Sequence, residues 1–375
     1  MKRSIPFLVS MIVPALSAAA VFGRGWLMLL PPAFLFVVTP VMDALLGHEK
    51  RDPPGHPDHW RDLRFDFWLW LWAPLQLVIQ VGALVAAPTA TPVELLGLIF
   101  ACGLLGGLGI NVSHELMHRK GAPERALAEV LLTTTSYAHF SVEHVLGHHK
   151  NVATPDDPGT AAKGDNLWWF VARSVLLSAL SAWRLEGARV HKLGIGFSLR
   201  DRRLRYPLAW ALVVTAVAVL AGASGVVWFA GQSAVAIFLL ETINYVEHYG
   251  LVRHQRPGDG GYERVTPDHS WSSAHRLTSL YLFNLPRHAD HHAQASRPWF
   301  ALRHIDDSPQ MPAGYATMLL LALVAPLWRA VMDPRVDAVN RKATAPPSES
   351  AAGQFSSGVA AARSEHAHRF FMQPD

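Results

Sequence analysis

The chain has 375 residues, of which 50% are hydrophobic, and its formal net charge is +4. Its apolar residues occur in long runs, which favours an integral membrane protein over a set of soluble domains. The single cysteine, Cys102, excludes a disulfide framework, a cysteine-based zinc site and a cysteine-ligated iron–sulfur centre within these residues. The sequence has no array of basic and aromatic residues that would indicate nucleic acid binding.

Six apolar runs are long enough to cross a bilayer, which needs about 20 residues. The first run follows Met1-Lys2-Arg3 and contains Ala18-Ala19-Ala20, so it also resembles a secretory signal peptide. We favour a retained span because further spans follow at once. The predicted spans cover residues 5–22, 26–46, 64–86, 93–112, 204–220 and 226–244.

The basic residues between the spans predict how the chain crosses the membrane. Lys and Arg at the N-terminus and in residues 47–63 place both segments in the cytoplasm. The segments after spans four and six then lie on the same side, and spans five and six form a hairpin around Gly222 and Gly225. We therefore expect an all-α integral membrane protein with about six transmembrane helices and a cytoplasmic domain.

Segments outside the spans complete the predicted organisation. Residues 126–142 and 167–190 are predicted helices of the cytoplasmic domain. Residues 312–332 are apolar but contain a proline and an arginine, which favours an amphipathic or re-entrant helix over a seventh span. We expect residues 1–335 to form one domain, and residues 340–375, rich in Ala, Ser and Pro, to be disordered.

Nine of the 20 histidines form three compact motifs and one lone position, each just after an apolar run. Imidazole is the commonest metal ligand near neutral pH, and i, i+4 spacing puts two rings on one helix face. Three such motifs in one membrane chain predict a metal cluster. The predicted ligands are His114, His118, His144, His148, His149, His248, His288, His291 and His292.

Carboxylates adjoin three of these histidines. Glu143, Glu247 and Asp290 are predicted to accept hydrogen bonds from ligand rings and fix their tautomers, with a solvated surface charge as the equal alternative. His139 and His269 lie near the motifs and are candidates for a similar supporting role. Nine neutral imidazoles without a thiolate favour iron or zinc. Because a structural zinc site needs only four ligands, we expect two iron ions.

The first motif allows two other interpretations. The string from His114 to His118 matches the HExxH signature of zinc proteases, but a protease site would leave six clustered histidines unexplained. Its fragment Glu115-x-x-His118 occurs in carboxylate-bridged di-iron bundles, which need a second copy. The only other match is Glu365-x-x-His368, near the C-terminus, so we prefer a histidine-rich site.

With these motifs in place, the chain resembles the alkane 1-monooxygenase family, the membrane di-iron alkane hydroxylases, over roughly residues 40–335. The three histidine motifs are shared with membrane fatty acid desaturases. The strings Asn244-Tyr245-Val246-Glu247-His248-Tyr249-Gly250 and Arg287-His288-Ala289-Asp290-His291-His292 favour the hydroxylases. Pro286 stands where a glutamine is usual, a departure that touches no presumed ligand.

The resemblance implies terminal hydroxylation of medium-chain linear alkanes to primary 1-alkanols, with dioxygen and two histidine-bound irons. It implies electrons from reduced rubredoxin, a separate chain that an NADH-linked reductase recharges. It further implies a multi-pass protein of the bacterial inner membrane, with the active site facing the cytoplasm and the alkane arriving from the bilayer. The oligomeric state stays open.

Two alternative functions also stay open. One is an acyl-lipid desaturase or hydroxylase of the same superfamily. The other is a non-catalytic metal transporter or sensor, which should place histidines within the spans near the midplane and not past their ends.

A basic segment, residues 184–205, is a candidate docking surface for the electron donor. With one cysteine and no Gly-x-Gly-x-x-Gly after a predicted strand, the chain needs an external carrier for a monooxygenase reaction. The seven Lys and Arg of the segment could steer an acidic partner such as rubredoxin. The alternative is that they only set the topology.

Overall fold

The computed structural model describes residues 4–52, 62–258 and 260–344, and within these ranges the chain is helical, with three isolated β-bridges and no strand. Among these residues, five helices are long and apolar enough to cross a membrane. The predicted all-α membrane fold is confirmed. The five candidate spans are Ile5–Gly23, Gly25–Leu46, Leu63–Thr89, Pro92–Met117 and Arg202–His248.

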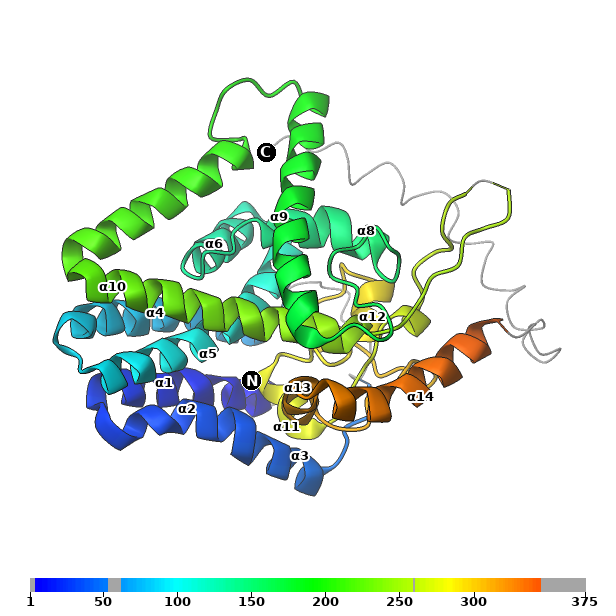
Figure 1. The fold of residues 1–375 in the computed structure, drawn as a ribbon, viewed down its shortest axis with the longest axis horizontal. Coiled ribbons are helices and arrows are strands. Elements are labelled where there is room, and N and C mark those ends of the chain that lie inside the picture. The colour runs from blue at the N-terminus through cyan, green and yellow to red at the C-terminus, as the bar shows by residue number, and fades with distance from the viewer. Residues whose placement is uncertain (1–3, 53–61, 259, 345–375) are drawn as a thin grey trace.

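The last of these helices, α10 (Arg202–His248), contains the predicted spans five and six. Gly222 interrupts it with φ 58° and ψ −150°, a conformation that glycine adopts without the steric cost of a side chain. The helix bends sharply there (Figure 1), which divides it into a first limb before Gly222 and a second limb after it. Each limb is long enough for a membrane crossing, which requires about 20 residues. The five candidate spans of the structure thus correspond to the six predicted spans.

The two N-terminal spans are irregular. A 3-10 turn, η1 (Ile5–Met11), leads into α1 (Ile12–Gly23). The second span is built from η2 (Gly25–Leu29), α2 (Leu30–Ala33), a π-helical turn η3 (Phe34–Val38) and α3 (Thr39–Leu46). Its prolines lack backbone N–H donors and so interrupt the regular ladder.

The candidate spans pack into a bundle. α1, α4 (Leu63–Ala86), α5 (Pro92–Met117) and the second limb of α10 lie side by side (Figure 1). Gly103 and Gly107 let α5 approach α10 closely, because a Cβ on either would lie 2.5–2.6 Å from Val235 or Leu239. α5 and the second limb of α10 run in the same direction, so their C-terminal ends meet at one end of the bundle (Figure 1).

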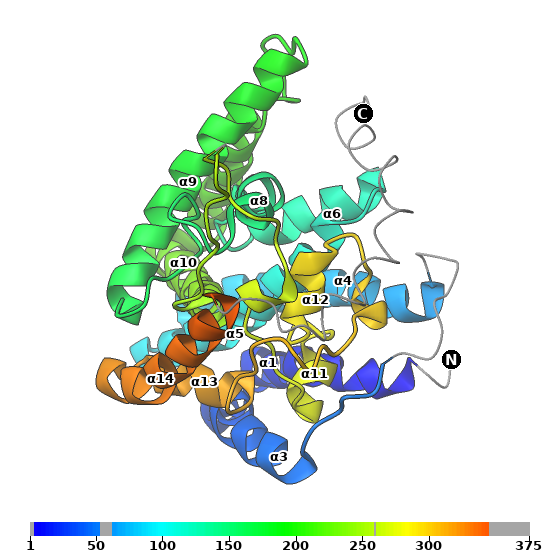
Figure 2. The same cartoon turned by 90° about the vertical axis from the view of Figure 1, so that its right-hand side faces the viewer.

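Short helices gather at that end, onto which Figure 2 looks, with α12 in the centre and α8 beside it. The helix predicted over 126–142 is instead two, because the chain turns at Ser136, where φ is 58°. The turn separates α6 from α7 and redirects the second histidine motif. The helices are α6 (Ala122–Thr133), α7 (Phe140–Glu143), η5 (His144–His148), α8 (His149–Asn151), α11 (Arg276–Tyr281) and α12 (His288–Ala293).

The remaining helices flank the bundle. α9 (Leu167–Lys192) confirms the helix predicted over 167–190. The apolar segment 312–332 is divided between α13 (Tyr315–Ala322) and α14 (Ala325–Thr344), neither of which is a candidate span. α14 runs past residue 340, where Asn340 Nδ2 donates to the carbonyl oxygen of Gly250 at 2.9 Å. The rest of the predicted tail and part of the 47–63 loop lie outside the described residues. Short turns at η4 (Ala87–Thr89), η6 (Pro267–His269) and η7 (Trp299–Ala301) complete the chain.

Candidate metal centre

The structure brings all nine predicted histidines together at the end of the bundle where α5 and α10 finish. α5 runs five residues beyond its predicted end, so His114 lies in its last turn and His118 directly follows it. His248 is the last residue of α10. The second motif spans η5 and α8, and the third lies on α12.

The nine side chains form two groups, a division that the sequence did not predict. Within each group, one nitrogen from every ring lies within 4.8 Å of the others. The five-histidine group contains His114, His118, His144, His149 and His291. The four-histidine group contains His148, His248, His288 and His292.

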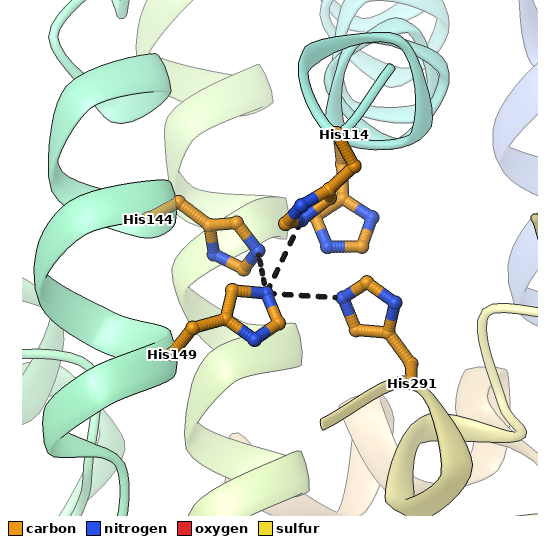
Figure 3. Close-up of side chains that lie close together, drawn as sticks. His114, His144, His149 and His291 are labelled. Atoms are coloured by element: carbon orange, nitrogen blue, oxygen red, sulfur yellow. Dashed lines mark hydrogen bonds between the residues drawn. The ribbon is translucent and has the colours of Figure 1, made fainter. Parts of the chain in front are cut away.

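In both groups the close contacts between rings join Nε2 atoms. In the five-histidine group, His149 Nε2 lies 2.9 Å from His144 Nε2 and 3.2 Å from His291 Nε2 (Figure 3). It also lies 3.2 Å from His118 Nε2. In the four-histidine group, His288 Nε2 lies 3.1 Å from His248 Nε2 and 3.0 Å from His292 Nε2.

These distances fit bound metal ions better than mutual hydrogen bonds. A neutral imidazole has one N–H, so His149 Nε2 cannot satisfy three neighbouring nitrogens at once. The Nε2 atoms of His114 and His148 are buried without a hydrogen-bond partner among the described residues. Two imidazole nitrogens at about 2.1 Å from one metal are about 3 Å apart when they bind at right angles. Each group could therefore hold a metal ion.

The electrostatics favour neutral rings with a free lone pair. Burial, with the charges of His148 and Arg119, lowers the pKa of His118 to about 3. Burial first, then neighbouring histidines, lowers the pKa of five more rings well below the ordinary value. These rings are His144, His149, His288, His291 and His292. Metal binding needs imidazole in its neutral form.

His148 differs because a carboxylate stands behind it. Burial works against its charge, yet the charge and hydrogen bond of Asp157 raise the pKa of His148 to about 9. Asp157 Oδ2 lies 2.9 Å from His148 Nδ1 and also accepts from Thr160 Oγ1 at 2.6 Å. A proton held on Nδ1 leaves Nε2 for the metal, the usual arrangement of a carboxylate behind a ligand histidine.

The sequence analysis did not single out Asp157. It follows the second motif in Thr154-Pro155-Asp156-Asp157-Pro158, and this polar string was a signal that the region is special. Nothing in the string shows which aspartate turns inward. In the structure Asp157 is buried and Asp156 is exposed.

The three predicted supporting carboxylates have different surroundings. Glu247 Oε2 lies 3.2 Å from His288 Nε2, the nitrogen that faces the group, so this carboxylate is on the metal side of the ring. Its Oε1 accepts from Tyr315 Oη at 2.7 Å. Asp290 contacts Arg297 and Arg303 at 3.0 and 2.9 Å. Glu143 is buried, and burial raises its pKa to about 8.

The other histidines and the zinc-protease alternative are clarified by contacts. His269 approaches the site through its backbone, because its carbonyl oxygen lies 3.4 Å from His248 Nδ1. His139 belongs to neither group.

Glu115, which would be the general base of a zinc protease, instead pairs with Arg119 at 2.7 Å. The HExxH string thus supplies two of five clustered imidazoles and no free base.

Comparisons with known proteins agree with this site. The fatty acid desaturase family model matches residues 90–322. Alkane 1-monooxygenase 1 of Pseudomonas aeruginosa is 42% identical over 313 residues, 81% of each chain. Alkane 1-monooxygenase 2 of Alcanivorax borkumensis is 39% identical over 318 residues, 82% of each chain. The xylene/toluene monooxygenase hydroxylase component of Pseudomonas putida is 25% identical over 331 residues, 86% of each chain.

The fold and the histidine groups define a multi-pass membrane enzyme of the fatty acid desaturase superfamily, with buried imidazoles arranged to hold metal ions. Within that superfamily the chain belongs to the alkane 1-monooxygenases, which match it above 30% identity over about four fifths of its length. It is therefore a monooxygenase, and the resemblance noted from the motifs is confirmed.

Proposed function

We propose that the chain hydroxylates the terminal carbon of medium-chain linear alkanes. One alkane, one dioxygen, two electrons and two protons give one primary 1-alkanol and one water. The nine histidines hold two irons, one in each group, and bound iron supplies the reductive activation of dioxygen. The two histidine groups beside apolar packing, in a chain related to alkane 1-monooxygenases, are the observation that carries the proposal.

An apolar approach to the five-histidine group supports an alkane substrate. A small cavity of about 10 Å³ touches His114 and His291 and is otherwise lined mainly by Phe283, Leu285, Trp299 and Leu302. A second cavity, of about 20 Å³, lies one turn away along α5, between α5, α10, α11 and α13. Its lining is apolar apart from two tyrosines. Cavities of this size hold no more than a water molecule or two, so these side chains would pack against an alkane chain only after moving apart.

The protein residues keep the imidazoles in place for this reaction. Asp157 orients His148, and the carbonyl oxygen of His269 faces the outer nitrogen of His248. Tyr315 holds Glu247 beside His288. A preorganised site of this kind needs little rearrangement when charge develops during the reaction.

The electron carrier is proposed to be reduced rubredoxin, recharged by an NADH-linked reductase. His118 and His149 are half-buried, whereas the four-histidine group is wholly buried. Lys120 and Lys150 follow these two histidines closely in sequence and are exposed. An acidic carrier that docks there would meet positive charge and lie close to the five-histidine group.

The location proposed for the protein is the bacterial inner membrane, with the metal centre facing the cytoplasm. The basic residues near the N-terminus and in residues 184–205 support this orientation. Because α5 and α10 both end at the histidine groups, the whole centre lies on one side of the membrane.

Iron quantitation and product analysis on the purified chain test the proposal together. We expect close to two irons per chain and 1-octanol from octane, with NADH-driven turnover only when rubredoxin and its reductase are both added. Dodecane tests the chain-length range. Full turnover of the purified chain with NADH alone would contradict the external carrier, and an iron-free active chain would contradict the metal assignment.

An acyl-lipid desaturase or hydroxylase is the second candidate, because the matching family model describes fatty acid desaturases. Incubation with an acyl lipid under the same conditions separates the two. An unsaturated or hydroxylated acyl chain, without 1-alkanol from octane, would favour this second function.

A further inference from the structure

A cavity of about 360 Å³ lies apart from the metal centre, between α6, α7, α9 and the first limb of α10. None of the nine clustered histidines lines it. Ala138, Val142 and Ala182 are buried residues of its inner part, whereas Trp183 and Trp210 are exposed at its edge. The volume falls in the range of small-molecule pockets, about 300–1,000 Å³. Its inner part offers an apolar ligand a mainly hydrocarbon surface.

Two arginines give this cavity a positively charged edge. Arg202 and Arg203 both line it, and the Arg203 guanidinium lies 5.9 Å from the centre of the Trp183 ring. Glu186 and Glu129 contact the Arg202 guanidinium at 3.5 and 3.4 Å, and Asp201 contacts that of Arg203 at 2.7 Å. An arginine has five N–H donors, and Nη2 of Arg202 and Nη1 of Arg203 make no hydrogen bond to any described residue. These donors remain for an anionic ligand.

The position along the chain places this edge at the membrane surface. Arg202 is the first residue of a candidate span, so it lies where the span meets the lipid headgroups. Residues 184–205 carry seven Lys and Arg but only two carboxylates. The same segment exposes Leu193, Leu199 and Phe197, the last of which is 95% exposed. Basic residues interleaved with exposed apolar ones are typical of a surface that contacts anionic lipid.

We propose that this cavity binds an anionic phospholipid from the bilayer, with an acyl chain between Trp183 and Trp210 and the phosphate at Arg202 and Arg203. The apolar interior fits the chain, and the arginine edge fits the phosphate. The alternative occupant of the basic segment, a soluble electron carrier, would leave the apolar interior unfilled and Phe197 in water. The inference does not depend on the proposed reaction.

Native mass spectrometry of the purified chain in detergent tests the site. Phosphatidylglycerol and phosphatidylcholine with the same acyl chains are titrated separately. We expect phosphatidylglycerol to bind at least about fivefold more tightly. Ala182→Trp, which fills the cavity, and the double variant Arg202→Gln with Arg203→Gln should each remove that preference. The control, Arg335→Gln with Arg341→Gln, removes two exposed charges from α14 and should keep it.

Three results would overturn the inference. Equal binding of the two lipids to the unaltered chain would exclude an anionic site, and an undiminished preference in Ala182→Trp would place the lipid elsewhere. Iron content and thermal unfolding of each variant are measured in parallel. If Ala182→Trp does not fold, the smaller change Ala182→Leu provides the same comparison. A rise in the rubredoxin requirement of the arginine variant, with lipid preference intact, would assign the segment to the carrier instead.

Discussion

The two histidine groups differ in exposure and in the contacts behind their rings. All four rings of the four-histidine group are buried, and Asp157, Glu247 and the His269 carbonyl lie against them. In the five-histidine group, His118 and His149 are half-buried, and a cavity touches His114 and His291. The contacts behind the four-histidine group restrict the movement of its rings, whereas the five-histidine group is accessible from outside.

This difference suggests which histidine group the substrate and the electrons reach. We propose that substrate and electrons approach the five-histidine group, because the cavity and the exposed Lys120 and Lys150 are both beside it. The four rings of the four-histidine group are buried, and we propose that this closed environment would retain a bound metal ion. The following predictions test this difference between the two groups.

The largest effect is expected from removing one ligand in each group. His292→Ala and His291→Ala should each lower turnover more than about 100-fold, beyond the range typical of supporting residues. Bound iron should fall in both variants. It should fall further in His292→Ala, because water reaches the closed group less easily and so cannot readily replace the lost ligand. Iron quantitation and octane turnover measure this. The control is His191→Ala, an exposed histidine outside both groups. Normal iron and turnover in either ligand variant would remove that residue from the site.

A smaller effect is expected behind the four-histidine group. Asp157→Asn removes the charge that orients His148, and such changes typically cost about 10–100-fold in metal affinity or activity. The rate of iron loss to a chelator should rise accordingly. Asp156→Asn, its exposed neighbour, is the matched control and should behave like the unaltered chain. Equal iron retention in both variants would show that Asp157 does not support the metal.

The apolar approach to the five-histidine group predicts a change in substrate range. Leu108 lines the cavity one turn from Asn111 on α5, so Leu108→Phe should obstruct long chains. We expect the ratio of dodecane to octane turnover to fall about tenfold, because losing the contacts of even one methylene in an apolar pocket costs about 1–3 kcal/mol. Leu212→Phe, at an exposed position on α10, is the control. An unchanged ratio in Leu108→Phe would place the substrate path elsewhere.

The smallest effect concerns the carrier. Reversing charge in Lys120→Glu with Lys150→Glu should raise the apparent KM for rubredoxin about three- to tenfold at low salt, with kcat unchanged. The effect should shrink at high salt because exposed charges are screened. Arg335→Glu with Lys342→Glu reverses two charges on α14 as the control. If the two double variants respond alike to salt, the docking surface is not beside His118 and His149.

The sequence determined the membrane fold and the residues of the centre. Apolar runs of span length were enough for the helices, because backbone groups in a bilayer must be paired within each helix. The histidine spacing was enough to nominate eight of the nine clustered rings, since i, i+4 positions share a helix face. The lone His248 was nominated by its place just after an apolar run. The positions at which helices break or turn were less well determined by the sequence. The turn at Ser136 and the π-helical turn η3 depend on local backbone conformations that no periodic pattern reveals.

Only the tertiary structure decided how the nine rings divide, and which carboxylates stand near them. The five-histidine group draws on the end of α5, on the consecutive turns η5 and α8, and on α12, so its membership depends on how three distant segments meet. Asp157 and Asp156 are chemically identical, and only the fold buries one behind His148. Glu247 adjoins His248 in sequence but faces His288 in space, because a helix points successive side chains in different directions.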